Sequence, residues 1–342
     1  MGAVFAFVGF DMTWMTRLTG LATESHAQVQ KHLHMQADKL MCAPNGQHYG
    51  AGHLTMPRLS KVQQAPIRAT GPLRVREVVA DVQALHTDPA NAGAVFQVAS
   101  QFNMLEMVSP RVSPEQGVGI YEHDHTQGPA CAIACGAGTI FRNYFVDVDG
   151  CGVLGQTESR QLNGLSGIDA ALDNTRHGYW DMVNGYMIPK PGGLDRLNAV
   201  LTAMDDQKQH ALLGALAVGH HANVEVTLGG AGHSVTQIYC SALPVSYCAD
   251  PDVAWSIFAR LVLKGAYEAT LRLAVQNAAL TGNNLVFLTL LGGGAFGNRA
   301  DWIVDAVLQG LACVADSGLD VRIVSYGGSS AVAQDILTQW HA

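Results

Sequence analysis

The sequence is poor in charged residues and has no surplus of positive charge. Asp, Glu, Lys and Arg make up 14% of the 342 residues, and 28 acidic side chains outnumber 20 basic ones, for a formal net charge of −8. General binding to a nucleic-acid backbone or an anionic membrane depends on Lys and Arg side chains that displace counterions. The composition therefore argues against both, although a local basic pocket is compatible with it.

Other common signatures are also missing. The seven cysteines form no CxxC pair, and Cys131 and Cys135 fall in an Ala- and Gly-rich run typical of small buried residues. Residues 1–10 are apolar but lack a basic n-region, and Asp11 follows at once, so neither a secretory signal nor a membrane span is indicated. We expect a cytoplasmic protein without a bound cofactor, and the oligomeric state stays open.

What the sequence does have is enough apolar residues for a large core, at 48% of the chain. Strand-like and helix-like patterns alternate along it, which favours an α/β fold with a three-layer mixed sheet between helices. Strands are expected at residues 4–8, 73–82, 94–100, 224–228, 235–241, 285–291 and 321–326. Helices are expected at residues 23–40, 128–144, 162–172, 194–216, 254–280 and from 301, with a last helix through Trp340.

The first seventy residues differ from the rest in composition. Residues 23–40 are rich in Gln, His and Lys, and residues 65–72 resemble a linker. We therefore expect an N-terminal extension at residues 1–70 that packs on a core domain at residues 71–342. Within that domain, two long stretches of loop-like or polar sequence read as insertions, at residues 104–127 and 145–230.

A glycine-rich stretch follows the apolar strand at residues 285–291. It runs from Gly292 through Asn298, and a helical pattern begins at Asp301. Glycines let backbone N–H groups approach a ligand closely, and the N-terminus of the next helix is electropositive. A phosphate group is therefore the ligand that suits this stretch. A tight strand-to-helix turn without a ligand is the plainer alternative.

The same stretch satisfies the G-x-G-x-x-G pattern of dinucleotide-binding Rossmann folds. That interpretation needs an acidic residue near the end of the next strand, to bind ribose hydroxyls. The strand at residues 321–326 ends in Ser325 and Tyr326 instead, and too little chain remains for the second half of the fold. We therefore reject it.

Another resemblance accounts for more of the chain. The segment LRVREVVADVQALHTDPANAGAVFQVASQFNML, with a strand ending near Asp81 and a second followed by Asn103, resembles the opening of a macrodomain, the ADP-ribose-binding fold. The stretch LTLLGGGAFGNRADW is similar to the loop that clasps the diphosphate and distal ribose, and its Gly-Ala-Phe-Gly core resembles that of poly(ADP-ribose) glycohydrolases. The resemblance extends from residue 73 to residue 326.

This resemblance implies a set of ligand-binding residues. Asp81 would meet the adenine, Asn103 and Phe296 the distal ribose, and Tyr326 the adenine or a ribose. The full set of expected ligand-binding residues is Asp81, Val82, Asn103, Gly128, Gly292, Gly293, Gly294, Ala295, Phe296, Gly297, Asn298 and Tyr326. The expected partner is ADP-ribose or an ADP-ribosylated substrate.

Hydrolysis of the distal-ribose glycosidic bond would need a carboxylate or a histidine near that ribose. The paired glutamates of the glycohydrolases have no clear counterpart, so we expect the catalytic groups among Glu106, Glu122 and Asp124. Two alternatives remain. One is a non-catalytic module that binds ADP-ribose or a related nucleotide. The other, less favoured, is a nucleotide-processing enzyme with a metal ion at the cluster of His123, Asp124 and His125.

Overall fold

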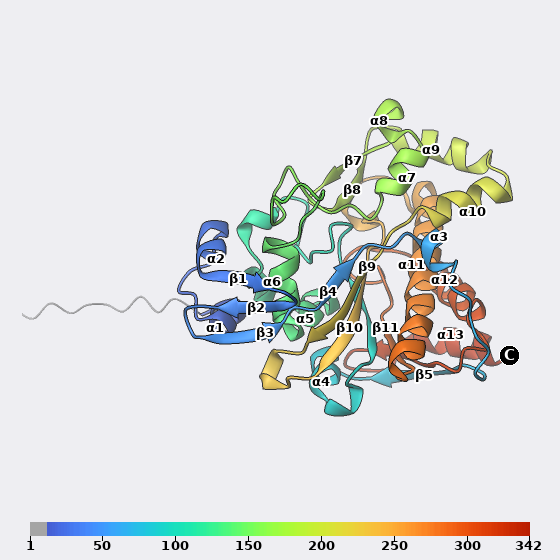
Figure 1. The fold of residues 1–342 in the computed structure, drawn as a ribbon. Coiled ribbons are helices and arrows are strands. Elements are labelled where there is room, and N and C mark those ends of the chain that lie inside the picture. The colour runs from blue at the N-terminus through green and yellow to red at the C-terminus, as the bar shows by residue number, and fades with distance from the viewer. Residues whose placement is uncertain (1–11) are drawn as a thin grey trace, which may run out of the picture.

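The computed structural model describes residues 12–342, and a seven-stranded mixed sheet forms its centre (Figure 1). The strand order is β4-β9-β10-β6-β11-β12-β5, in which β5, β6, β10, β11 and β12 run parallel and β9 runs antiparallel to both neighbours. The strands are β4 (His53–Thr55), β5 (Arg74–Val79), β6 (Val95–Ala99), β9 (Gly219–Glu225), β10 (Ser234–Cys240), β11 (Leu285–Leu288) and β12 (Asp320–Ser325).

Helices cover both faces of this sheet, which confirms the expected three-layer α/β fold. Helices α4, α5 and α6 pack on one face, whereas α11, α12 and α13 pack on the other. Their bounds are α4 (Val82–Thr87), α5 (Gln127–Ala134), α6 (Gly136–Tyr144), α11 (Asp252–Thr281), α12 (Ala300–Ala312) and α13 (Ala331–His341). The longest of these, α11, is followed by Gly282, whose φ of 78° is a left-handed conformation that favours glycine at the end of a helix.

The remaining elements lie at the periphery. A meander of β1 (Leu33–Gln36), β2 (Lys39–Cys42) and β3 (Gln47–Gly50) forms a small second sheet, and β7 (Trp180–Val183) pairs with β8 (Tyr186–Pro189). The other helices are α1 (Trp14–Thr19), α2 (His26–His32), α3 (Leu59–Val62), α7 (Ser166–Ala171), α8 (Asn174–His177), α9 (Gly193–Thr202) and α10 (Asp206–Gly214). Short 3-10 helices are η1 (Pro89–Asn91), η2 (Pro114–Gln116), η3 (Gly119–His123), η4 (Leu228–Gly230) and η5 (Val245–Tyr247).

Residues before position 71 contribute to the main sheet directly. Strand β4 pairs antiparallel with β9 at the edge of the seven-stranded sheet. Helix α1 and the β1-β2-β3 meander pack through their own hydrophobic cluster, which contains Trp14, Leu33 and Leu40, against α6. The division at residue 71 stays a prediction, and β4 ties the preceding segment to the core.

Several local expectations were wrong, each because a polar or apolar pattern was extended too far. Residues 23–40 are not one helix, since α2 stops at His32 and the chain turns into β1. The run at 128–144 is two helices, separated at Cys135, and the run at 194–216 is also two helices, α9 and α10. The strand expected at 224–228 ends at Glu225, and Leu228 begins η4. The strand expected at residues 4–8 lies outside the described residues.

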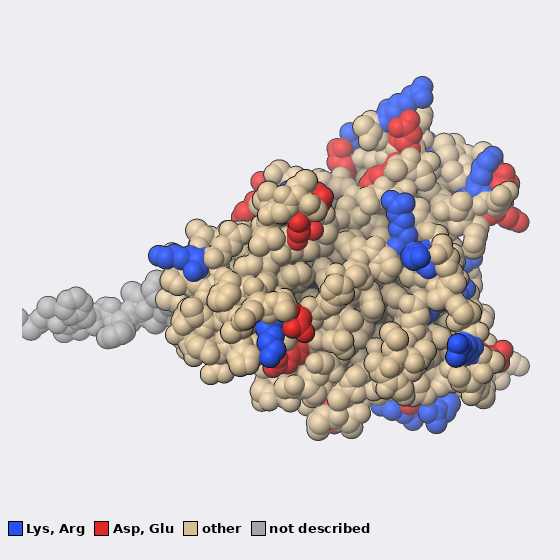
Figure 2. Space-filling view, viewed as in Figure 1, with Lys and Arg blue, Asp and Glu red and all other residues tan. Residues whose placement is uncertain are grey.

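The surface reflects the sparse charge of the sequence. Figure 2 shows one face of the molecule, on which Lys, Arg, Asp and Glu side chains stand singly or in small mixed groups. Within residues 12–342, every helix is too short or too polar to cross a membrane.

Candidate functional site

A groove opens at the carboxyl edge of the parallel strands, where β6 and β11 separate. These strands pair only at Val95 with Val286 and at Phe96 with Phe287, so their ends diverge. The side chain of Gln127 fills the gap: its Oε1 accepts from the Ala99 N–H at 2.9 Å, and its Nε2 donates to the Gln97 carbonyl at 2.8 Å. In open α/β sheets, ligands bind at such a divergence beyond the carboxyl ends of the strands. The groove has a cavity volume of about 1210 Å³.

The glycine loop between β11 and α12 forms one wall of the groove. Gly292 and Gly297 have φ values of 77° and 69°, and a Cβ at Gly297 would lie 1.8 Å from the Ser246 Oγ. Those two glycines are therefore pressed against the protein and must stay small. Gly293 and Gly294 are exposed and line the groove, and a Cβ at Gly294 would meet nothing within 4 Å. The backbone of this loop is thus open to a ligand at its centre and packed at both ends.

Several helices point their N-termini at the same groove. Ala300 of α12, Ser330 before α13 and Thr126 before α5 all line it. Neither α5 nor α12 has a side-chain hydrogen bond that caps its first turn. The N-termini of α5 and α12 supply partial positive charge without Lys or Arg side chains, which suits a phosphate or diphosphate, whereas the N-terminus of α13 is already occupied by Glu77.

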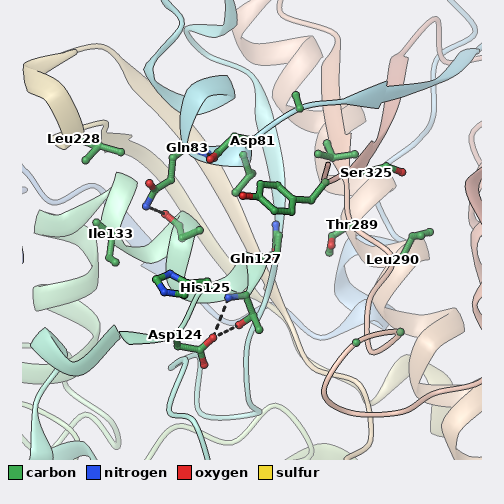
Figure 3. Close-up of a pocket in the computed structure, with 18 of the residues that line it drawn as sticks. Asp81, Gln83, Asp124, His125, Gln127, Ile133, Leu228, Thr289, Leu290 and Ser325 are labelled. Carbon is green, nitrogen blue, oxygen red and sulfur yellow. Dashed lines mark hydrogen bonds between the residues drawn. The ribbon is translucent and has the colours of Figure 1, made fainter. Parts of the chain in front are cut away.

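Asp81 stands at the start of α4, on the opposite side of the groove from the glycine loop. Its carboxylate accepts from the Gln83 N–H at 2.7 Å and caps the helix, while the side chain itself is exposed. Figure 3 shows Asp81 and Gln83 together on this side and Thr289 and Leu290 on the other. An exposed carboxylate at this position can accept a further hydrogen bond from a ligand.

The loop between β12 and α13 is organised by a single glutamate. Glu77 on β5 accepts hydrogen bonds from the Ser325 and Ser329 hydroxyls, the Ser330 N–H and the Gln334 side chain, all between 2.6 and 2.7 Å. Partial desolvation opposes its ionisation, but these four donors outweigh it and lower the pKa of Glu77 to about 2. The ionised carboxylate therefore fixes the loop that carries Tyr326, which lines the groove and is 81% exposed.

The segment from Glu122 to Gln127 forms the floor of the groove in its middle. Glu122 already accepts from the Trp14 N–H at 2.9 Å and pairs with Arg17. Asp124 accepts from the Thr126 N–H and hydroxyl, at 2.9 and 2.7 Å. In Figure 3 His125 lies beside Asp124, between the two sides of the groove. Asp124 and His125 are the groups on this floor that could exchange protons with a ligand.

Glu106 lies close to this floor but is sealed from it. Its carboxylate is 2% exposed and meets the Arg142 Nη2 at 3.2 and 3.3 Å, and Arg142 is fully buried. Burial raises the pKa of Glu106 to about 7, and the nearby guanidinium opposes that rise only in part. Gly128 separates the pair from the groove: a Cβ there would lie 2.0 Å from the Ala99 carbonyl and 3.2 Å from the Glu106 Cγ.

The expected site residues fall into two groups. Those that line the groove are Asp81, Val82, Glu122, Asp124, Gly293, Gly294, Asn298 and Tyr326. Those that do not line it are Asn103, Glu106, Gly128, Gly292, Ala295, Phe296 and Gly297. The structure therefore places the residues after β5, the glycine loop and the 122–127 segment around the same groove. A single ligand that contacts all three requires this arrangement. Their roles in binding or catalysis stay predictions.

Two of the residues outside the groove have other partners. Asn103 is fully buried, donates to the Gln161 Oε1 at 2.8 Å and accepts from the Leu105 N–H. Phe296 packs among Tyr186 and Tyr247, with ring centroids 5.4 and 5.5 Å away. Residues of the 145–230 stretch thus cover the end of the glycine loop and the end of β6.

Sequence reasoning did not single out several residues that shape the groove. Gln127 and Glu77 act through hydrogen bonds to distant backbone, and Arg17 and Tyr49 come from the N-terminal segment. Gln127 directly precedes the helix that the sequence predicts, but Ala99, its hydrogen-bond partner at the end of β6, is 28 residues away in the chain. Among residues 12–342, no three His, Cys, Asp or Glu side chains are arranged to hold a metal ion.

No protein-family model matches the sequence, and no curated protein matches it. Solved structures do match. The poly(ADP-ribose) glycohydrolase from Thermomonospora curvata is 12% identical with a TM-score of 0.46, over 95% of this chain and 98% of that one. Its complex with the inhibitor ADP-HPD gives 13% and 0.45, with the same coverage. The Deinococcus radiodurans enzyme in complex with ADP-ribose is 9% identical with a TM-score of 0.45, over 84% and 93%. In its fold, the chain is similar to these glycohydrolases.

Proposed function

We propose that this protein binds ADP-ribose or an ADP-ribosyl group in the groove and hydrolyses the glycosidic bond of the distal ribose. The observation that carries the proposal is the convergence of Asp81, the Gly293-Gly294 backbone and the α12 N-terminus on one groove. These are the elements that the sequence resemblance assigns to adenine and diphosphate. A groove without lysine is compatible with a diphosphate, because helix N-termini and glycine N–H groups provide the positive potential.

Each part of the ligand has a matching chemical group. The exposed Asp81 carboxylate would accept a hydrogen bond from the adenine amino group, and the Tyr326 ring would cover a base or ribose. The diphosphate would lie against Gly293, Gly294 and the start of α12. The distal ribose would then lie toward the floor at Asp124 and His125.

Hydrolysis requires a group that activates water and a group that protonates the leaving oxygen or nitrogen. Water would add to the anomeric carbon as the bond to the leaving group breaks. Of the three expected carboxylates, Asp124 is the one that faces the groove without a cationic partner among the described residues. We therefore assign water activation to Asp124, with His125 able to pass a proton to the leaving group.

Calorimetric titration with ADP-ribose tests the binding half of the proposal. We expect a saturable heat signal with a dissociation constant in the micromolar range, about −8 kcal/mol. No heat at millimolar ADP-ribose would rule out this function. The Asp81→Ala variant should bind more weakly, while Glu158→Gln, which alters an exposed residue outside the groove, should bind like the parent protein.

Release of ADP-ribose from a modified peptide tests the catalytic half. The Asp124→Asn variant keeps the shape of the side chain and should lose activity by at least about a hundredfold, the usual contribution of general acid–base groups, while it keeps ADP-ribose binding. Full activity in this variant would exclude Asp124 as the catalytic group.

A non-catalytic ADP-ribose-binding module is the second candidate, and one observation favours it. Glu106 is sealed and paired with Arg142, and Glu122 is held by Trp14 and Arg17, so two of the three expected carboxylates are already engaged. Tight binding of ADP-ribose with no release from modified proteins, under conditions where a known glycohydrolase is active, would establish this alternative.

A further inference from the structure

The groove is larger than one small-molecule site. Ligand pockets usually measure about 300–1,000 Å³, and this groove has about 1210 Å³. The additional space lies away from the glycine loop, over the outer side of α5. We call this part the α5 lobe, and define it by the side chains of Leu18, Tyr49, Ile133 and Leu228 and the backbone of Gly229 and Gly230. In Figure 3, Ile133 and Leu228 lie on the side opposite Thr289 and Leu290.

The lining of the α5 lobe is apolar. Leu18, Tyr49, Ile133 and Leu228 are all half-buried and turn part of their surface to the groove. Leu228 belongs to none of the three hydrophobic clusters of the described chain, so its side chain has unused apolar surface. Gly229 and Gly230 have φ values of 63° and 69°, and a Cβ at either would meet nothing within 4 Å, which leaves their backbone open.

The charges around the α5 lobe do not suit a second phosphate. Arg17 is the guanidinium on the groove wall, and it is already paired with Glu122. The α1 N-terminus is also occupied, because the Trp14 N–H donates to Glu122. The remaining acidic side chains of the wall are those of Asp81 and Asp124. The anion-binding features are therefore confined to the glycine-loop side, and the α5 lobe favours a neutral or cationic apolar group.

We propose that the α5 lobe binds the polypeptide segment to which an ADP-ribosyl group is attached, through apolar residues beside a Lys or Arg. This rests on the proposed function, which directs the distal ribose toward Asp124 and His125, where the two sides of the groove meet. The leaving group then extends from that point over Ile133 toward Leu18 and Leu228. The protein would prefer ADP-ribosylated polypeptides over free ADP-ribose, ADP-ribosylated DNA and ADP-ribose polymers.

The experiment compares binding of four probes by calorimetry. The first probe is free ADP-ribose. The second, the Leu/Lys peptide, has Leu and Lys beside a serine that carries ADP-ribose through an uncleavable triazole link, and the third, the Glu peptide, has Glu in place of that Leu and Lys. The fourth is an oligonucleotide with a terminal ADP-ribosyl group. We expect the Leu/Lys peptide to bind about tenfold more tightly than free ADP-ribose, since burial of one or two apolar side chains supplies at least that factor. The peptide with Glu in place of Leu and Lys and the oligonucleotide should bind no more tightly than free ADP-ribose.

Two variants separate the lobe from the rest of the groove. Leu228→Asp places a charged side chain in the α5 lobe. It should abolish the tenfold tighter binding of the Leu/Lys peptide and leave the affinity for free ADP-ribose unchanged. Leu280→Asp, at an 87% exposed position near the end of α11, is the matched control and should keep the gain.

The outcomes are distinguishable. If free ADP-ribose does not bind, the proposed function fails. If free ADP-ribose binds but the Leu/Lys peptide binds no better, or Leu228→Asp has no effect on the gain, the lobe proposal alone fails. Tighter binding of the oligonucleotide than of the Leu/Lys peptide would overturn the choice of polypeptide as occupant.

Discussion

Two glutamates lie just outside the groove, and they stabilise their surroundings in opposite ways. Glu77 lies half-buried at the end of the sheet, and four donors from the β12–α13 loop surround its carboxylate. Glu106 lies in the interior behind α5, where its charged partner is Arg142 and its backbone N–H donates to the Tyr121 hydroxyl. One carboxylate organises a surface loop through many neutral donors, and the other is paired with one buried cation in the interior.

The difference shows in the pKa values. Donors that stabilise the charged form lower the pKa of Glu77 to about 2, whereas burial raises the pKa of Glu106 to about 7. A carboxylate with enough hydrogen bonds near water stays ionised, but a buried ion pair costs desolvation that the attraction does not fully offset. The loop beside Tyr326 is therefore held by charge at every physiological pH. The interior behind α5 contains a buried pair whose protonation responds to pH.

Breaking the buried pair should have the largest effect. Glu106→Ala leaves the Arg142 guanidinium buried and without its carboxylate, and the free energy of unfolding should fall by about 3–5 kcal/mol. Urea denaturation followed by circular dichroism measures this. The matched control is the double variant Glu106→Leu, Arg142→Met, which removes both charges and should recover most of the loss. A loss below 1 kcal/mol in the single variant would show that Arg142 does not depend on Glu106.

Removing the charge of Glu77 should have a smaller effect on stability and a specific effect on the loop. Glu77→Gln keeps the shape but weakens the hydrogen bonds from Ser325, Ser329 and Ser330, and should cost about 1–2 kcal/mol, because the site is partly exposed to water. Amide hydrogen exchange of residues 325–334 should become faster than in the parent protein. Glu158→Gln, which removes a charge from an exposed side chain, controls for the change in net charge, and equal exchange in both variants would contradict the role of Glu77.

The pH dependence of stability should separate the two residues. The folded-state pKa of Glu77 is lowered from 4.5 to about 2, so its contribution is present above pH 4.5 and is lost as the pH falls toward 2. The folded-state pKa of Glu106 is raised from 4.5 to about 7, so the folded state binds the extra proton, and stability falls as the pH rises from 4.5 to 7. Thermal melts of Glu77→Gln should be flatter between pH 2 and 4.5, and those of Glu106→Gln flatter between 4.5 and 7. A profile unchanged in either variant would refute the corresponding shift.

Tyr326 should give the smallest effect, and an effect on binding alone. Its ring is largely exposed on the loop that Glu77 holds, so Tyr326→Ala should leave stability unchanged. ADP-ribose affinity should fall by about two- to tenfold, the contribution of one aromatic contact. Tyr326→Phe should bind as the parent does, and an equal loss in the Phe variant would assign the contact to the hydroxyl rather than to the ring.

Apolar periodicity predicted the centre of the molecule well. The runs around β6 and β12 and the long pattern of α11 form the elements expected from them, because strands buried on both faces and long buried helices leave a strong local signal. The strand expected at residues 285–291 also forms, as β11, but it ends at Leu288. Apolar periodicity did not predict the bounds of helices and strands where the residues are small or polar. Cys135 interrupts a run that looked continuous, and the chain after His32 turns into a strand although the polar pattern continues.

The site was predictable in part. The glycine loop could be found from a local pattern of glycines between a strand and a helix, whereas Asp81 was expected only from the resemblance to macrodomains. The structure adds that Asp81 also caps α4. Glu106 is the instructive residue. In the sequence it is a carboxylate three residues after Asn103, and only the tertiary structure places Arg142 against it and Gly128 in front of it.

The sequence by itself therefore determined the alternating α/β pattern, the phosphate-suited glycine loop and the shortage of general positive charge. Those properties depend on residues close together in the chain or on composition. The tertiary structure decided which carboxylates face the groove, that Gln127 fills the gap between β6 and β11, and that the N-terminal segment supplies Leu18 and Tyr49 to the α5 lobe. These depend on contacts between residues far apart in sequence, where burial and pairing, rather than residue type, set the chemistry of each side chain.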